Sequence, residues 1–252
     1  MNGNVAVAVL GARGRMGSEA VRAIEAAPDL DLVAALGRND PLDQLVSSGA
    51  SVVVDLTVPE STVGNVTFAL EHGIHAVVGT TGWNQDRLAQ LSVLLERNPE
   101  TGVLIAPNFA LGSVLATAFA ARAARYFESV EIVELHHPEK VDAPSGTAVR
   151  TAELISRART EAGVPASPDA TTSSLPGARG AVIEGIAVHS VRLRGLTAHQ
   201  EVLFGSRGEQ LTIRHDSFDR ASFMPGVLLG IRTVASRPGL TVGLDGYLDL
   251  QG

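Results

Sequence analysis

The first 27 residues constrain the fold more than any other part of the chain. Val5–Leu10 is a short apolar run rich in β-branched residues, which is typical of a strand buried on both faces of a parallel sheet. Three glycines follow with the spacing G-x-x-G-x-x-G, and residues 18–27 have the pattern of a helix. A strand, a glycine-rich turn and a helix in this order open dinucleotide-binding folds, because the glycines let the backbone approach a pyrophosphate at the helix N-terminus. A plain strand-to-helix turn is the structural alternative.

Apolar runs and helical patterns alternate through the rest of the N-terminal half. The predicted strands are residues 31–36, 51–57, 74–78 and 103–106, and the predicted helices are residues 60–71, 85–97 and 110–127. This alternation favours a parallel sheet with right-handed connections, and such sheets bind ligands beyond the carboxyl ends of their strands. We therefore predict that three loops at these ends bind the cofactor. They are Gly11, Ala12, Arg13, Gly14, Arg15 and Met16, then Gly79, Thr80 and Thr81, and then Ala106, Pro107, Asn108 and Phe109.

The end of the second predicted strand bears on the choice of cofactor. An acid at this position usually holds the adenosine ribose hydroxyls of NAD, whereas this chain has Gly37 and Arg38. A guanidinium can bind a phosphate through two hydrogen bonds, so Arg38, helped by Arg13 or Arg15, is a candidate for binding the 2′-phosphate of NADP. A solvated loop arginine is the alternative for each of the three. The pattern favours NADPH and leaves the use of NADH open.

The C-terminal half predicts a second domain of different construction. Its predicted elements are a strand at residues 130–135, a helix at 147–159, short strands at 186–193, 201–205 and 210–214, and a last helix at 223–235. Such short runs are typical of a mixed or antiparallel sheet, and the Ser-, Thr-, Pro- and Gly-rich residues 165–180 predict a mobile surface loop, a candidate lid. We expect an α/β protein with an N-terminal Rossmann-type parallel sheet and a second α+β domain containing a mixed sheet. Residues 1–109 and 217–252 are expected to form the dinucleotide-binding domain, and residues 110–216 the second domain.

Residues 134–148 have the composition of an active site. They contain two adjacent histidines and Lys140, which is the only lysine among the 20 Lys and Arg residues of the chain. Lysine offers a compact, rotatable ammonium where arginine offers a planar fork, which indicates that an ammonium is needed here. The turn that follows leads into a predicted helix, whose N-terminal N–H groups can bind an anion. The structural alternative is a polar loop in which Lys140 pairs with Glu139 or Asp142.

Composition and charge argue against several other classes of protein. The net charge of −7 and the lack of a basic tract argue against a nucleic-acid partner. A chain without cysteine has no disulfide, thiol catalysis or cysteine-bound metal. We predict no metal site, because adjacent residues such as His136 and His137 point to opposite faces of an extended segment, while His72 and His75 fit a helix end and a strand start. No secretory signal or membrane-spanning run is evident, so a cytoplasmic protein without a membrane partner is expected.

The signature HHxxKxDAPSGTA at residues 136–148, together with the glycine turn and residues 79–81 and 106–109, closely resembles the dihydrodipicolinate reductases. These enzymes are also called 4-hydroxy-tetrahydrodipicolinate reductases, and the resemblance covers essentially the full length of the chain. It implies reduction of a cyclic dicarboxylate to tetrahydrodipicolinate with NADPH or NADH, in the diaminopimelate route to lysine. It also implies a cytoplasmic homotetramer that assembles through the sheet of the second domain.

The resemblance also implies roles for residues of the motif. His136 takes the place of the family's catalytic acid/base and Lys140 that of its second proton donor, while His137, Gly146 and Thr147 match positions that bind the substrate. An imidazole suits proton exchange near neutral pH, and an ammonium can stabilise developing negative charge. Spacing alone does not decide which histidine exchanges the proton, and the choice of His136 follows the resemblance.

At the cofactor end, Arg38 matches an arginine that some family members use for the NADP phosphate, while Gly37 stands where the family has an acid. The glycine turn and residues 79–81 and 106–109 match the family's cofactor-binding segments. Two other functions fit parts of the sequence, namely a different two-domain NAD(P)-dependent oxidoreductase and a non-catalytic nucleotide sensor. Neither gives a reason for a lone lysine within a double-histidine motif.

Overall fold

The computed structural model describes residues 3–248, and the chain divides into two compact units. Of the described residues, 3–111 and 220–248 belong to the first unit, and 112–219 belong to the second. The dinucleotide-binding and substrate-binding roles that the sequence suggests for the two halves, and the boundaries drawn there, remain predictions.

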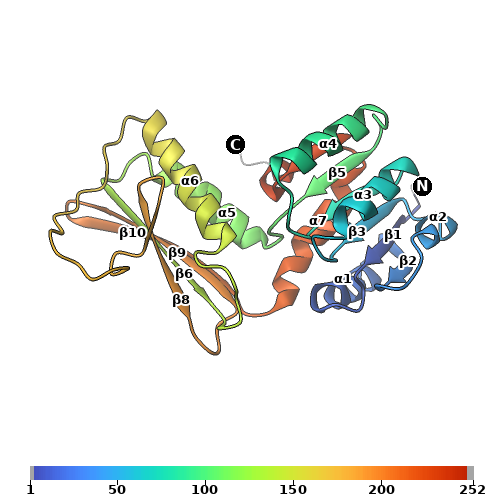
Figure 1. Ribbon diagram of the computed structural model, residues 1–252, viewed down its shortest axis with the longest axis horizontal. Coiled ribbons are helices and arrows are strands. Elements are labelled where there is room, and N and C mark those ends of the chain that lie inside the picture. The colour runs from blue at the N-terminus through green and yellow to red at the C-terminus, as the bar shows by residue number, and fades with distance from the viewer. Residues whose placement is uncertain (1–2, 249–252) are drawn as a thin grey trace. The chain divides into compact units, whose positions relative to one another are not determined.

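The first unit is built on a six-stranded sheet in the order β11-β5-β4-β3-β1-β2 (Figure 1). The strands are β1 (Val5–Leu10), β2 (Leu30–Leu36), β3 (Val52–Asp55), β4 (His75–Val78), β5 (Gly102–Ile105) and β11 (Gly239–Val242). Every neighbouring pair is parallel, so the carboxyl ends of all the strands lie at one edge. The predicted Rossmann-type sheet is confirmed. Strand β11 was not predicted, because a four-residue run has no readable periodicity and its pairing with β5 depends on tertiary structure.

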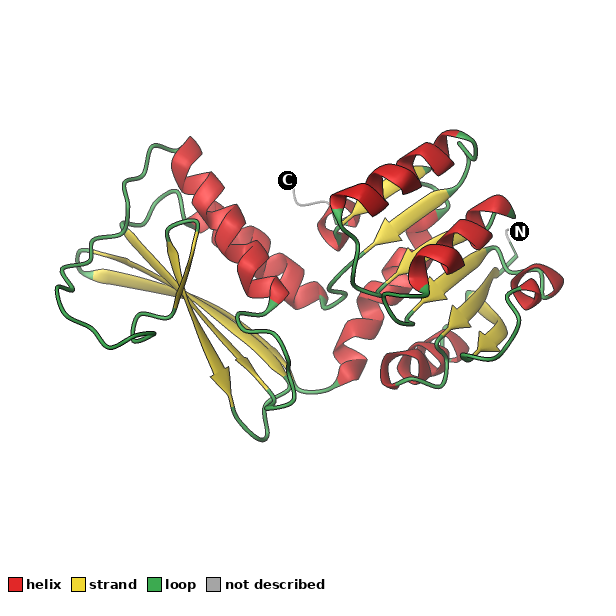
Figure 2. Cartoon of the chain, viewed as in Figure 1, coloured by secondary structure: helices red, strands yellow, loops and turns green. Residues whose placement is uncertain are grey.

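Helices cover both faces of this sheet (Figure 2). They are α1 (Arg15–Glu25), α2 (Asp43–Ser47), α3 (Thr62–Glu71), α4 (Gln85–Glu96) and α7 (Met224–Val234), with 3₁₀ turns η1 (Arg220–Phe223) and η2 (Leu244–Tyr247). Helix α1 contacts α7, which also packs on β3, β4 and β5, and α3 contacts α4. Helix α1 begins earlier than predicted, because the N–H of Ser18 already donates to the carbonyl of the N-cap Gly14 at 2.9 Å.

The second unit contains a mixed five-stranded sheet in the order β10-β9-β6-β8-β7. Its elements are α5 (Leu111–Ala123), β6 (Ser129–His136), α6 (Gly146–Glu161), β7 (Ala181–Ile183), β8 (Ile186–Arg192), β9 (Ala198–Ser206) and β10 (Glu209–Ser217). Strands β6 and β8 are parallel and the other neighbours are antiparallel, so the predicted mixed sheet is confirmed. Helices α5 and α6 pack on one face, where Ile132, Ile155 and Phe204 are buried together. Residues 165–180 form no helix or strand, as predicted, and their role as a lid remains a prediction.

Arg159 binds the segment that follows α5. It lies on α6, is 5% exposed, and donates to four backbone carbonyls, those of Ala124, Phe127, Glu128 and Pro165, at 2.7–3.5 Å. The helix predicted for residues 110–127 stops at Ala123, and the guanidinium supplies hydrogen bonds to carbonyls of the segment that follows. A charged group can be buried when it is hydrogen-bonded, and these carbonyls provide the acceptors for Arg159. The side chain thereby links α6 to the segment that follows α5.

Replacing Arg159 by methionine should lower the free energy of unfolding by about 2–4 kcal/mol, because buried carbonyls lose their donor. Urea denaturation of the full chain, followed by circular dichroism, measures this loss. Arg157→Met on the exposed side of the same helix is the matched control, and it should change stability by no more than about 0.5 kcal/mol. Equal losses in the two variants would contradict the role assigned to Arg159.

Candidate active site

The glycine turn is packed tightly between β1 and α1. Gly11 has a φ of 78°, and a Cβ there would lie 2.5 Å from the carbonyl oxygen of Leu56. A Cβ on Gly17 would lie 2.0 Å from the carbonyl oxygen of Gly11. Only glycine fits these two positions, so the surface of the turn is formed by the backbone itself.

The first turn of α1 supplies groups that can bind an anion. Arg15 is its first residue, and the N–H groups of Arg15 and Met16 have no acceptor within the helix. The N–H groups of Gly11 and Ala12 both donate to the carbonyl of Leu36, at 2.9 and 3.0 Å, so they hold the turn against β2. Because the first turn carries no acid, the positive end of the helix is open to a pyrophosphate.

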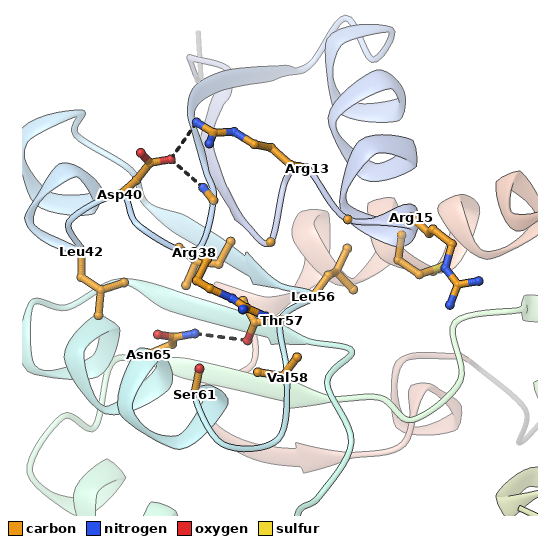
Figure 3. Close-up of a pocket in the computed structure, with 15 residues that line it drawn as sticks. Arg13, Arg15, Arg38, Asp40, Leu42, Leu56, Thr57, Val58, Ser61 and Asn65 are labelled. Carbon is orange, nitrogen blue, oxygen red and sulfur yellow. Dashed lines mark hydrogen bonds and ion pairs between the residues drawn. The ribbon is translucent and has the colours of Figure 1, made fainter. Parts of the chain in front are cut away.

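A cavity of 660 Å³ lies beside this turn, at the carboxyl ends of β1, β2 and β3 (Figure 3). It brings together the glycine turn and the three arginines that the sequence associates with a phosphate. Its lining also includes Thr57, Ser61 and Asn65, which sequence reasoning did not identify. The other predicted cofactor segments, residues 79–81 and 106–109, follow β4 and β5 instead.

Asp40 is an acid at this cavity that sequence reasoning missed. Its Oδ2 accepts hydrogen bonds from the Gly37 N–H at 2.7 Å and from Arg13 Nη2 at 3.2 Å (Figure 3). An acid was expected at the end of β2, where Gly37 stands, and the carboxylate of Asp40 reaches that place from three residues further along the chain. The Asp40-Pro41 pair is typical of a turn and is the sequence signal that could have identified this acid. Arg13 is paired in this way, whereas Arg38 makes no side-chain hydrogen bond within residues 3–248.

Asp55 at the end of β3 connects the cavity to the loop after β4. It is fully buried, and its Oδ1 accepts from the hydroxyls of Thr57 at 2.6 Å and Thr80 at 2.8 Å. A Cβ on Gly79 would lie 2.9 Å from the ring of Phe109, so residues 79–81 and 106–109 are in contact. The structure thus brings the predicted loops of β4 and β5 together, with Asp55 as an unpredicted link to β3.

In the second unit, the motif is organised around Glu134, which is fully buried on β6. Its Oε2 lies 2.5 Å from His136 Nδ1 and 2.8 Å from Arg192 Nη1. Its Oε1 accepts from Arg192 Nη2 at 2.8 Å and from the Ser145 N–H at 3.1 Å. Burial raises the pKa of Glu134, but hydrogen bonds from Arg192, Ser190 and His136 outweigh burial and hold the pKa below its ordinary value. Sequence reasoning missed Arg192 because it lies 58 residues away on β8.

The two histidines occupy different environments. The side chain of His136 is 14% exposed, and burial lowers its pKa. The cations of Lys140 and Arg192 act in the same direction and Glu134 opposes them, with a lowered pKa as the net result. The neutral ring is therefore favoured at neutral pH. Nδ1 of His137 is buried without a hydrogen-bond partner in the described chain, which is unusual for a buried polar atom.

Lys140 and the start of α6 both bind the carboxylate of Asp142. The Lys140 ammonium donates to Oδ1 at 2.7 Å, which is one of the pairings named in the structural alternative. The N–H of Gly146 donates to Oδ2 at 3.3 Å. Burial raises the pKa of Asp142, but the hydrogen bonds from Lys140 and Gly146 contribute to a net lowering. A Cβ on Gly146 would meet no atom within 4 Å, and the neighbouring Thr147 is half-buried. The groups that bind the Asp142 carboxylate, the Lys140 ammonium and the Gly146 N–H, therefore lie next to open space.

None of the helices within residues 3–248 is long and apolar enough to span a bilayer. The same residues contain no group of three or more His, Asp or Glu side chains placed to hold a metal ion.

Comparison with known proteins places both halves of the chain in one family. Residues 5–109 match the family described as dihydrodipicolinate reductase, N-terminus, and residues 112–248 match dihydrodipicolinate reductase, C-terminus. The 4-hydroxy-tetrahydrodipicolinate reductase of Streptomyces griseus subsp. griseus is 67% identical over 244 residues, which cover 97% of this chain and 98% of the relative. The enzyme of the same name from Streptomyces avermitilis is 65% identical with the same coverage. The solved structure of dipicolinate-bound dihydrodipicolinate reductase from Paenisporosarcina sp. TG-14 is 39% identical, with a TM-score of 0.85 over 97% of this chain and 100% of that chain.

Proposed function

Because this chain belongs to the dihydrodipicolinate reductase family, we propose that it reduces 4-hydroxy-tetrahydrodipicolinate to tetrahydrodipicolinate with a nicotinamide nucleotide. This reaction is a step of lysine biosynthesis through diaminopimelate. The observation that carries the proposal is the motif geometry, in which an imidazole, an ammonium and a helix N-terminus adjoin one another in a chain that matches the family along its length. A different oxidoreductase or a nucleotide sensor would not explain that arrangement.

The first unit fits a nicotinamide nucleotide. Side chains at Gly11 and Gly17 would collide with the backbone, so a ligand can approach the backbone of this turn closely. The turn leads into the N–H groups of Arg15 and Met16, which have no acceptor within the helix. A bound nicotinamide nucleotide supplies the hydride. We assign binding of this nucleotide to the three predicted loops, residues 11–16, 79–81 and 106–109, and to Arg38.

The second unit fits a dicarboxylate, and the Paenisporosarcina relative is described as bound to dipicolinate. We assign one substrate carboxylate to the Lys140 ammonium and to the N–H groups of Gly146 and Thr147, because Lys140 and Gly146 already hold the carboxylate of Asp142. His137 contributes to substrate binding through Nδ1, which has no hydrogen-bond partner among the described residues. His136 exchanges a proton as the acid/base, and Lys140 stabilises developing negative charge and serves as the second proton donor.

We propose NADPH as the preferred cofactor, with NADH also used, because the Arg38 guanidinium at the cavity has no partner within residues 3–248. Arg38→Ala should raise the KM for NADPH about tenfold, which corresponds to the loss of one charged hydrogen bond. The KM for NADH should change by less than about twofold, because NADH has no 2′-phosphate for the guanidinium to bind. Steady-state kinetics with each cofactor measures both values, with the exposed Arg97→Ala as control. An equal change for both cofactors would remove Arg38 from the phosphate site.

The function itself is tested by adding freshly prepared 4-hydroxy-tetrahydrodipicolinate to the purified chain with NADPH or NADH. Loss of the absorbance of the reduced nicotinamide reports turnover, and the ratio of the two rates reports the cofactor preference. Rapid turnover with either cofactor supports the proposal. A folded protein that binds a cofactor but reduces no substrate would refute it, and would favour another oxidoreductase or a sensor.

We also propose a cytoplasmic homotetramer, as the resemblance implies. The face of the mixed sheet opposite α5 and α6 carries the half-buried Val133 and Leu135, which supports assembly through this sheet. Light scattering of the purified chain measures the assembly, and a monomer at micromolar concentration would contradict it.

A further inference from the structure

We propose that Glu134 is a positioning residue that fixes His136 in the tautomer with its proton on Nδ1, so that Nε2 alone exchanges a proton with the substrate. Arg192 holds the Glu134 carboxylate in place for this task. The inference deepens the proposed function and rests on it, since it concerns how the proposed acid/base is oriented.

The tautomer follows from the hydrogen-bonding capacity of a carboxylate. Glu134 accepts two hydrogen bonds from Arg192 at 2.8 Å and one from the Ser145 N–H at 3.1 Å. These donors favour the ionised carboxylate, which can only accept hydrogen bonds. His136 Nδ1, 2.5 Å from Oε2, must therefore carry a hydrogen. A neutral imidazole has one N–H, so Nε2 is the free position, and in the charged ring Nε2–H is the acid.

The same carboxylate also ties the imidazole to the carboxylate-binding end of α6. Ser145, which donates to Oε1, is the N-cap residue of that helix. Arg192 Nη2 donates in addition to the carbonyl of Asp142 at 2.7 Å. Glu134 and Arg192 thus connect the end of β6 to both ends of the loop at residues 142–145. The position of His136 Nε2 relative to the N–H groups at the start of α6 is therefore fixed. Reaction rates depend steeply on the relative position of such groups.

A second cluster on β6 has the same residue types without this placement. Glu131 Oε2 lies 2.7 Å from His189 Nε2, and Glu131 also pairs with Arg179. The side chain of Glu131 is 33% exposed, whereas that of Glu134 is 0% exposed. The two glutamates lie on opposite faces of the sheet, because side chains alternate along a strand. The Glu131 cluster lies outside the motif and on the face proposed for assembly, so Glu131→Gln is a matched control when light scattering shows that it assembles as the parent does.

Glu134→Gln should invert the tautomer of His136. The glutamine amide nitrogen must replace either Oε1 or Oε2, and at either position it meets a donor from Arg192. Beside Ser145 it also meets a backbone N–H, which cannot become an acceptor. Beside His136 it meets a ring nitrogen, which can become an acceptor if the proton moves to Nε2. The second arrangement costs less, so the variant should hold the neutral ring with its proton on Nε2.

The experiment combines ring-nitrogen NMR of the neutral histidines with steady-state kinetics, and it assigns the His136 signal by its loss in His136→Gln. We expect a proton on Nδ1 in the parent and on Nε2 in Glu134→Gln, with kcat lowered about 10²- to 10⁴-fold. Glu131→Gln should leave kcat and the His136 signal unchanged, and Glu134→Asp, which keeps the charge, should retain the Nδ1 tautomer and more activity than Glu134→Gln.

A parent protein with the proton on Nε2 would overturn the inference, and this reading depends on no substitution of Glu134, since only His136→Gln is needed for the assignment. An unchanged tautomer in Glu134→Gln, or a fall in kcat no larger than that of Glu131→Gln, would overturn it as well. Failure of the proposed function is a separate result, because a parent without turnover on either cofactor still reports the tautomer of His136.

Discussion

Lys140→Ala should lower turnover by about 10²- to 10⁴-fold while binding of NADPH is retained. The ammonium is assigned both to a substrate carboxylate and to proton donation, and such groups supply gains of this size in the transition state. Cofactor binding should persist because the glycine turn and the cavity belong to the first unit, whereas Lys140 belongs to the second. Single-turnover kinetics and cofactor titration of the same preparation separate the two effects. Equal activity in parent and variant would remove the role assigned to Lys140.

Two further variants separate catalysis from a structural pairing of Lys140 with Asp142. Lys140→Arg keeps the positive charge but replaces a compact ammonium with a guanidinium that does not release its proton, so it should not restore turnover. Asp142→Asn removes the charge of the partner and keeps the ammonium. It should therefore retain most of the turnover. If Asp142→Asn and Lys140→Ala lose activity equally, the pairing of the two residues explains the loss, and the lone lysine is structural.

His136→Gln should lower kcat by about 10²- to 10⁴-fold, the range that a positioned acid/base contributes, with little change in stability. The amide N–H of glutamine can still donate to Glu134, so the buried carboxylate keeps a donor at this position. The amide neither gains nor loses a proton near neutral pH, so it cannot act as an acid or base, and the chemistry should fail although the fold persists. Urea denaturation should show a loss of about 1 kcal/mol, typical of a single substitution. A loss of stability large enough to unfold the chain would indicate a structural role for His136 instead.

Features that depend on neighbours along the chain could be predicted from the local sequence. The β-branched run of β1 and the glycine spacing after it led to a parallel Rossmann-type sheet, because strand propensity, the positive φ of Gly11 and the close approach of Gly17 to Gly11 depend on nearby residues. The motif at residues 134–148 is contiguous, so its lone lysine, its histidine pair and the coming helix could be recognised together. The fold class is confirmed, whereas the roles of the motif residues remain proposals.

The contacts between groups that lie far apart in the sequence depend on the tertiary structure. Arg192 reaches Glu134 from 58 residues away, and Thr80 reaches Asp55 from 25 residues away. Strand β11 joins the sheet only through pairing with β5. A buried carboxylate needs donors and a short strand needs a partner, but neither need specifies where along the chain the partner lies. The positions of these partners follow from how the sheets and helices pack, and no local sequence period encodes that packing.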